Sequence, residues 1–264
     1  MIILLPPSAG KTAPPAGNAP LDLNQLAFPE FTRLREELID ELAAVSATPE
    51  GVQILKAGPK IADEVLEQIE LADLPTGPAY QVFSGVLYAA ANFANLQPAQ
   101  LERAGESVLI ASALFGMLRF SDPIPRYRLG MSNPLPGGTP KARWAKLWSA
   151  LNPVAENQLV IDARSADYAG WKPPASAEVV KINAVRLRGD GSRQTVSHSA
   201  KYFRGLIAGL ALRAPIPPED PEALAELAGE LIGRHTPGGG SIVGVELDPP
   251  QRRGAPRELV MVEA

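Results

Sequence analysis

The residues best suited to chemistry lie between Leu109 and Met131, after an apolar run that is expected to form a buried strand ending near Ser112. Pro123 and Pro125 stiffen the loops that follow it. Polar side chains on stiff loops at the end of a buried strand are typical of a binding site. The candidates in this stretch are Ser112, Arg119, Asp122, Tyr127 and Arg128. An alternative for Arg119 and Asp122 is a structural ion pair that closes the loop.

Two further groups repeat this arrangement. The apolar run Leu159–Ile161 delivers Asp162, and Ser165 and Tyr168 follow it. Ser165 would alternatively cap a short helix that contains Tyr168. Lys201 and Arg204 are three residues apart in an expected helix, so they share one face of it. Their side chains are either simply exposed to solvent, or they complete an anion-binding cleft together with the two groups above.

Several classes of site are excluded by composition. The 264 residues include no cysteine, which excludes disulfides, thiolate zinc sites, iron–sulfur clusters and cysteine nucleophiles. Two histidines are too few for a multi-histidine metal site. Gly10-Lys11-Thr12 is not a phosphate-binding P-loop, because Leu5 stands where a glycine is needed and Pro14-Pro15 disfavour the helix that should follow. We expect no resident metal and no cofactor.

Charge is unevenly distributed along the chain. The net charge is -4, yet residues 119–204 carry +8, residues 1–118 carry -8 and residues 205–264 carry -4. Nine of the fourteen basic residues in the central part are arginine, which suits bidentate recognition of phosphate or carboxylate. The sequence thus favours a positive face despite its acidic balance. The alternative is that these charges scatter over a solvated surface.

Elements that would position these residues alternate between helical and strand patterns. Helices are expected at residues 29–46, 59–71, 78–95, 141–151, 199–213 and 220–233. Strands are expected at residues 2–5, 107–113, 127–131, 159–162, 178–187, 193–198, 241–247 and 257–262. We predict one α+β domain over residues 1–264, with a mixed sheet and a helical subregion at about 28–104. Since no apolar run reaches membrane length and no signal segment is seen, we expect a cytoplasmic protein.

The order of these blocks resembles the YaaA family of bacterial peroxide-stress proteins. The matching blocks are Ile3–Ser8 with Lys11-Thr12, Ser84–Tyr88, Ser112, Gly116–Arg119, Asp122, Tyr127–Met131, Trp148, the group Asp162, Ser165 and Tyr168, and finally Lys201 with Arg204-Gly205. The resemblance implies a cytoplasmic protein that binds DNA in a basic cleft and limits oxidative DNA damage linked to iron. It also implies a mixed fold with a helix-hairpin-helix-like element.

Residues 54–66 are the candidate for that element, with a Gly-Pro turn ahead of a helix N-terminus and with Lys56 and Lys60 beside it. Such a hairpin offers backbone N–H groups to a phosphate without reading bases. The alternative is a pair of ordinary packed helices joined by a Gly-Pro turn.

Two functions follow as hypotheses. In the first, the chain binds the DNA backbone, largely independently of sequence. The residues expected to bind DNA or another anion are Lys11, Ser112, Arg119, Tyr127, Arg128, Ser165, Tyr168, Lys201 and Arg204, with Lys56 and Lys60 on the hairpin.

In the second hypothesis, the chain is an enzyme acting on a small anionic or nucleotide-like substrate. Asp122 or Asp162 would then be a general base, and Lys11 or Lys201 an electrostatic stabiliser or nucleophile. Direct iron binding by carboxylates such as Asp122, Asp162 and Asp167 is a weaker idea, and we treat iron as part of the physiology and not as a ligand of this protein.

Overall fold

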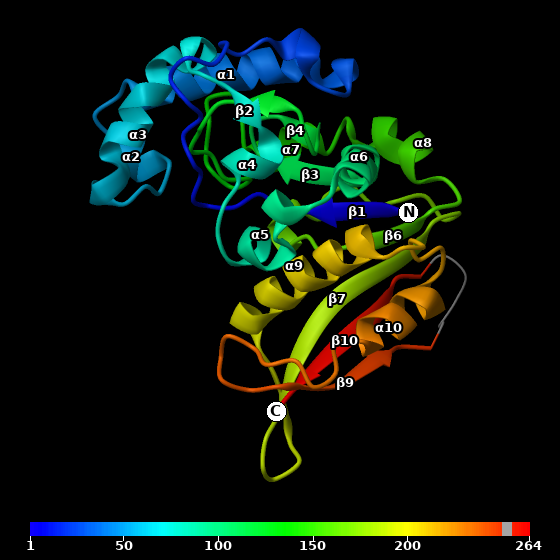
Figure 1. Cartoon of the computed structure of the whole chain (residues 1–264). Coiled ribbons are helices and arrows are strands. Elements are labelled where there is room, and N and C mark those ends of the chain that lie inside the picture. The colour runs from blue at the N-terminus through cyan, green and yellow to red at the C-terminus, as the bar shows by residue number, and fades with distance from the viewer. Residues whose placement is uncertain (250–254) are drawn as a thin grey trace.

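A sheet of eight strands forms the centre of the computed structural model, which describes residues 1–249 and 255–264 (Figure 1). The strands are β1 (Ile2–Leu5), β3 (Val108–Ser112), β4 (Gly116–Arg119), β6 (Leu159–Asp162), β7 (Glu178–Leu187), β8 (Arg193–Thr195), β9 (Ile242–Leu247) and β10 (Arg257–Glu263). Their order is β4-β3-β1-β6-β7-β10-β9, and β8 pairs with β7. The five strands from β3 to β10 in this order are parallel, and β4, β8 and β9 are antiparallel to their neighbours. The predicted α+β fold with a mixed sheet is confirmed.

Helices cover the sheet and fill the connection between β1 and β3. That connection contains α1 (Thr32–Ser46), α2 (Gly51–Ile54), α3 (Ala62–Glu67), α4 (Ala79–Val82), α5 (Val86–Ala91) and α6 (Pro98–Ser107). Later come α7 (Pro140–Trp144), α8 (Asn152–Ala155), α9 (Ser197–Arg213) and α10 (Pro221–Gly229). Short 3-10 helices lie at Leu23–Gln25, Pro29–Phe31, Pro59–Ile61, Gln68–Asp73, Phe93–Asn95, Trp148–Leu151 and Ala166–Tyr168. A small second sheet pairs β2 (Gly77–Pro78) with β5 (Pro123–Ile124).

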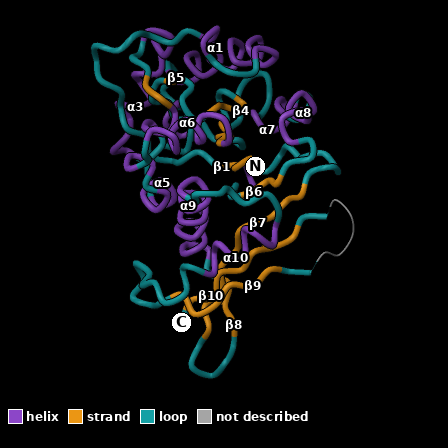
Figure 2. Tube along the Cα trace, turned by 45° about the vertical axis from the view of Figure 1, so that its right-hand side comes forward, coloured by secondary structure: helices purple, strands orange, loops and turns teal. Residues whose placement is uncertain are grey.

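The arrangement of these parts is seen from two sides in Figures 1 and 2. Helices α1 and α3 gather at one end of the molecule, and β9 and β10 lie at the other. Helix α9 runs along β7 and packs against α5. Every residue of β1, β3 and β6 is buried. These strands could be predicted from sequence because a parallel strand covered on both faces is a continuous apolar run. No helix in the described residues is both long enough and apolar enough to cross a membrane.

The expected helix at 78–95 is wrong as a single element. It is divided into α4, α5 and the 3-10 helix Phe93–Asn95. Gly85 has φ of 101° and Asn92 has φ of 53°, both in the left-handed region that a continuous helix does not contain. The expected helix at 141–151 is likewise divided, into α7 and the 3-10 helix Trp148–Leu151. The break at Gly85 matters for the site, because it turns the start of α5 toward the loop after β1.

The expected strand at 127–131 is also wrong. Its residues form no strand, because their backbone groups bind side chains instead of a neighbouring strand. The amide of Arg128 donates to the Gln68 side chain, and the amide of Gly130 donates to Asn133 Oδ1 at 2.6 Å. The segment is therefore an ordered loop held by two buried amide side chains.

The candidate helix-hairpin-helix element consists of α2, a turn, the 3-10 helix Pro59–Ile61 and α3. Lys56 has φ of 51° in that turn. The amides of Lys56 and Ala57 donate to the carbonyls of Gln53 and Val52, at 3.0 and 2.9 Å. Two amides of the turn are therefore already used within it, and the helix-hairpin-helix assignment stays a prediction.

Candidate functional site

A pocket of about 660 Å³ opens where β1 and β6 end. The two strands are parallel neighbours, with Leu4 paired to Asp162, so their carboxyl ends lie side by side. From there the chain continues to β3 on one side of β1 and to β7 on the other side of β6. Connections that diverge in this way leave a crevice, which is where open parallel sheets commonly bind ligands. The loop Pro6–Lys11 and the turn Ser165–Tyr168 line the crevice.

We name this cavity the basic pocket after its five cationic side chains, Lys11, Lys56, Arg128, Lys201 and Arg204. They come from four separate stretches of the chain. Among residues 1–249 and 255–264, none of the five has a carboxylate within ion-pair distance. By contrast Arg126, Arg143 and Arg193, from the same basic part of the sequence, are each paired with glutamate. Asp167 is the carboxylate among the lining residues. The pocket therefore carries a net positive charge.

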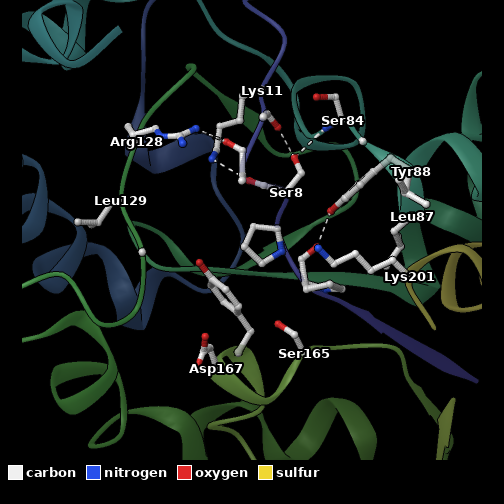
Figure 3. A pocket seen from close by; sticks show the side chains of 18 of the residues that line it. Ser8, Lys11, Ser84, Leu87, Tyr88, Arg128, Leu129, Ser165, Asp167 and Lys201 are labelled. Atoms are coloured by element: carbon white, nitrogen blue, oxygen red, sulfur yellow. Dashed lines mark hydrogen bonds between the residues drawn. The ribbon is translucent and has the colours of Figure 1, made fainter. Parts of the chain in front are cut away.

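The charged groups are spread around the cavity (Figure 3). Lys11 and Arg128 lie on one side, Lys201 lies on the other, and Ser165 and Asp167 line a third side. An anion in the middle would thus be approached by cations from more than one direction, which strengthens binding compared with a single surface charge.

Hydrogen bonds from α5 and the segment before it hold the loop after β1. The amide of Ser84 donates to the Ser8 hydroxyl at 2.8 Å, and the Tyr88 hydroxyl donates to the Pro6 carbonyl at 2.9 Å. The Tyr88 pKa is well above its ordinary value because the phenol is buried, so it stays protonated and keeps this bond. The loop is therefore rigid where it presents Lys11.

Lys11 is the most enclosed of the five cations. Its Nζ donates to the Ser8 carbonyl at 3.1 Å and lies 4.2 Å from the centre of the Tyr127 ring. Burial, and secondly the Arg128 guanidinium, lower the pKa of Lys11 to about 7, with Glu64 opposing the change. The same amine is therefore a cation in part of the molecules and a neutral base in the rest at neutral pH.

The turn after β6 contributes Ser165 and Tyr168. Ser165 occupies the N-cap position of the 3-10 helix Ala166–Tyr168, but its side chain makes no capping hydrogen bond. The alternative that Ser165 serves only as a cap is therefore not supported, since its hydroxyl is left to the pocket. Burial, and secondly Asp167, raise the pKa of Tyr168 to about 12, so this phenol is neutral.

Helix α9 contributes Lys201 and Arg204 from one face, as their spacing predicts. Lys201 is exposed, whereas Arg204 is half-buried and donates from Nε to the Ile182 carbonyl at 3.2 Å. Burial lowers the pKa of Arg204, and Asp162 opposes this. The close approach of α9 to α5 depends on Gly205, because a Cβ there would overlap the Leu87 carbonyl oxygen.

Asp122 and Arg119 are not part of the basic pocket. The Asp122 carboxylate is buried and accepts hydrogen bonds from the amides of Ala27 and Arg119, at 3.1 and 3.0 Å. The Arg119 guanidinium instead donates to the Glu106 carbonyl at 2.8 Å. The loop is thus closed by the Asp122 carboxylate and backbone amides, not by the side-chain ion pair considered as an alternative.

Ser112 and Asp162 also point away from the pocket. Ser112 is fully buried, with its Oγ 2.8 Å from the Tyr127 hydroxyl and 2.9 Å from the Phe115 amide. Asp162 accepts two hydrogen bonds from the buried Arg164 guanidinium, at 2.8 and 2.9 Å. Neither carboxylate proposed as a general base lines the cavity, so neither is placed to act on a ligand bound there.

Tyr127 and Lys60 lie near the basic pocket but do not line it. Tyr127 is buried beneath Lys11 and supports it through its ring, and burial raises the pKa of this phenol. Lys60 is exposed and lies on the 3-10 helix Pro59–Ile61, but it does not line the basic pocket.

Ser8, Ser84 and Tyr88 also line the pocket, but they were not among the predicted site residues. Ser8 and Ser84 fall in short polar stretches that directly follow buried segments, which is a signal of the same kind as the one at Ser165. Within the described part of the chain, no group of three His, Cys, Asp or Glu residues could hold a metal ion.

Comparison with known proteins identifies the family. The family model described as peroxide stress protein YaaA matches residues 1–230. The chain belongs to this family. Similar proteins include a UPF0246 protein of Corynebacterium efficiens, 41% identical over 221 residues that cover 81% of this chain and 86% of the relative. A UPF0246 protein of Streptomyces coelicolor is 37% identical over 236 residues, covering 88% and 90%. The resemblance to the YaaA family is confirmed.

Proposed function

We propose that this YaaA-family protein binds the phosphate backbone of DNA in the basic pocket and thereby limits oxidative, iron-linked DNA damage during peroxide stress. One observation carries the proposal: five cations without carboxylate partners in the described residues converge from separate stretches of chain. Contacts of this kind release counterions from DNA and do not depend on base sequence. The peroxide-stress family supports the physiological part of the proposal.

The pocket offers different kinds of contact at its rim and its floor. Lys56 and Lys201 are exposed and reach phosphates outside the cavity, and Lys60 extends the charge along the 54–66 hairpin. Arg128 and Arg204 each use one guanidinium nitrogen on a backbone carbonyl, which fixes their orientation while other N–H groups remain for a phosphate. The Tyr168 ring would stack on an unpaired base.

A salt titration tests the DNA-binding proposal. Fluorescence anisotropy with a labelled 20-base-pair duplex is measured at 50 and 200 mM KCl. If three to five phosphates are neutralised, the affinity should fall by about 40- to 500-fold across this range, from a slope of about 0.9 per phosphate. Absence of binding at 50 mM, or affinity that does not change with salt, contradicts the proposal.

Two matched variants locate the binding surface. Lys201→Ala removes an exposed cation of the basic pocket, and Lys146→Ala removes an exposed cation that does not line it. Lys201→Ala should weaken binding at 50 mM KCl and reduce the salt slope by about one. Lys146→Ala should leave both unchanged. Equal losses in the two variants would mean that binding is due to overall charge and not to the pocket.

A second candidate function is catalysis on a small anionic or nucleotide-like ligand in the same pocket. Its volume falls within the range of about 300–1,000 Å³ usual for small-molecule sites. Lys11 is half-buried and its pKa is lowered, and phosphate binding does not require either property. Thermal denaturation with deoxynucleoside monophosphates tests the ligand-binding step that this candidate requires. A rise in Tm that Lys201→Ala reduces supports ligand binding in the pocket, and no rise at millimolar ligand contradicts the candidate.

A further inference from the structure

Lys11 has surroundings that the exposed cations of the basic pocket lack. Its amine lies over the Tyr127 ring, with the Phe83 ring centre 5.4 Å away. No carboxylate in the described residues lies within ion-pair distance of it. Two charged groups act on it, the Arg128 guanidinium of the same sign and, more weakly, the Glu64 carboxylate of the opposite sign. An enclosed amine beside another cation is the standard way to make a lysine nucleophilic, because both effects favour the neutral form.

The loop around Lys11 fixes the direction of the amine. The Nζ is held by the Ser8 carbonyl, and Lys11 forms an isolated antiparallel bridge with Phe83. The Thr12 amide donates to the Val82 carbonyl at 2.8 Å, which secures the residue after it. The nucleophile is thus positioned before any ligand arrives, which lowers the entropic cost of reaction.

The other cations indicate which carbonyl compound would reach this amine. Arg128 lies next to Lys11, and Lys201 lies across the cavity (Figure 3). A ligand that fills the space between them would carry a phosphate at one end and present its reactive carbon to Lys11. We propose that Lys11 forms a Schiff base with a phosphorylated aldehyde bound in the basic pocket. This inference rests on the proposed function in one respect, since it assumes that the remaining cations bind phosphate.

The reaction balances without any oxidant or reductant. The neutral Lys11 amine attacks the aldehyde carbon, so a C–N bond forms as the C–O π bond breaks. The oxygen gains a proton and the nitrogen loses one, giving a carbinolamine. The hydroxyl then gains a proton and leaves as water, while the nitrogen lone pair forms the C=N bond and the nitrogen gives up its remaining proton. Two sources supply such an aldehyde: the ring-opened deoxyribose of an abasic site in DNA, and a free sugar phosphate.

Borohydride trapping tests the inference on the full-length protein. The protein is incubated at pH 7.5 with deoxyribose 5-phosphate, or with a duplex that carries one abasic site. Sodium borohydride then reduces any imine to a stable secondary amine, and peptide mass spectrometry maps the modified lysine. We expect modification concentrated on Lys11, with a yield about tenfold higher for deoxyribose 5-phosphate than for unphosphorylated deoxyribose, because only the former is held by the cations.

Variants and a parallel DNA titration separate the possible outcomes. Lys11→Arg should abolish the adduct, and Lys146→Arg, at an exposed position outside the pocket, should not. Peptide mapping of the adduct on the wild-type protein tests the inference even if Lys11→Arg does not fold. Labelling spread evenly over surface lysines, or no adduct with either probe, overturns the inference. Salt-dependent DNA binding without an adduct contradicts the Schiff-base inference alone. A Lys11 adduct without DNA binding contradicts the DNA-binding proposal alone. An adduct with one probe alone identifies the source of the aldehyde.

Discussion

Replacing Lys11 with methionine should change how the stability of the protein depends on pH. Methionine fills nearly the same space and cannot be protonated. The Lys11 pKa is lowered from its ordinary value of 10.5 to about 7, chiefly by burial and secondly by Arg128. At 1.36 kcal/mol per pH unit, the full difference corresponds to about 5 kcal/mol. Because the side chain is partly exposed, solvent screening reduces this upper limit, and we expect about 1–3 kcal/mol to be measured.

The sign follows from proton linkage. Between pH 7 and 10.5 the unfolded chain holds a proton on Lys11 that the folded protein has released, so stability of the wild type rises with pH in that window. Below pH 7 both states are protonated and the full cost of burying the charge is present. The Lys11→Met variant has no such pH-dependent contribution to its unfolding free energy. Tyr127, the phenol under the amine, does not interfere below pH 9, because burial raises its pKa.

Urea unfolding at pH 6.5, 7.5 and 9 measures this effect. The difference in unfolding free energy, wild type minus Lys11→Met, should increase by about 1–3 kcal/mol from pH 6.5 to pH 9. All other titrating groups are common to both proteins, so they largely cancel in the difference. A difference that stays constant within about 0.5 kcal/mol would refute the reasoning, since Lys11 would then have an ordinary pKa in the folded state.

Three further substitutions test the architecture of the site. Gly205→Ala should destabilise the protein by about 1–3 kcal/mol or more in urea unfolding, because the new Cβ overlaps the Leu87 carbonyl, whereas Gly229→Ala, with open space around it, should not destabilise. Asp122→Asn should lower stability by about 1–3 kcal/mol without changing DNA affinity in anisotropy, and a selective loss of affinity would contradict its structural role. Asp167→Asn should strengthen DNA binding about 2- to 5-fold at 50 mM KCl by removing a carboxylate from the pocket, and weaker binding would argue against phosphate as the ligand.

Much of the sheet could be predicted from the sequence because its strands differ clearly from their surroundings. β1 and β6 are short apolar runs, and the Gly189–Gly191 turn indicates the hairpin of β7 and β8. The break in the expected helix 78–95 was missed because its Ala, Phe and Tyr content outweighed the Ser84-Gly85 step and Asn92, which are the local signals of a break. What divides it is the backbone at Gly85 and Asn92, where φ is positive.

The site was predicted in part, and the failures share one cause. Residues that follow a buried strand point either into the crevice or back into the core, and sequence does not distinguish the two. Ser165 and Lys11 point into the pocket. Asp122 and Ser112 are used by the core, and the amide partner of Asp122 at Ala27 lies 95 residues away in the chain. Such long-range partners leave no local pattern.

The positive charge of the pocket depends on which cations lack partners, more than on how many cations the central part of the sequence contains. Arg126, Arg143 and Arg193 belong to the same basic stretch, but glutamates on α3, α1 and β9 neutralise them. Glutamates from the acidic flanks therefore neutralise these three arginines, whereas in the described residues no carboxylate lies within ion-pair distance of the five cations around the crevice after β1 and β6. Under the proposed function, this distribution would give an acidic protein a local site for a polyanion, with the enclosed Lys11 amine beside it.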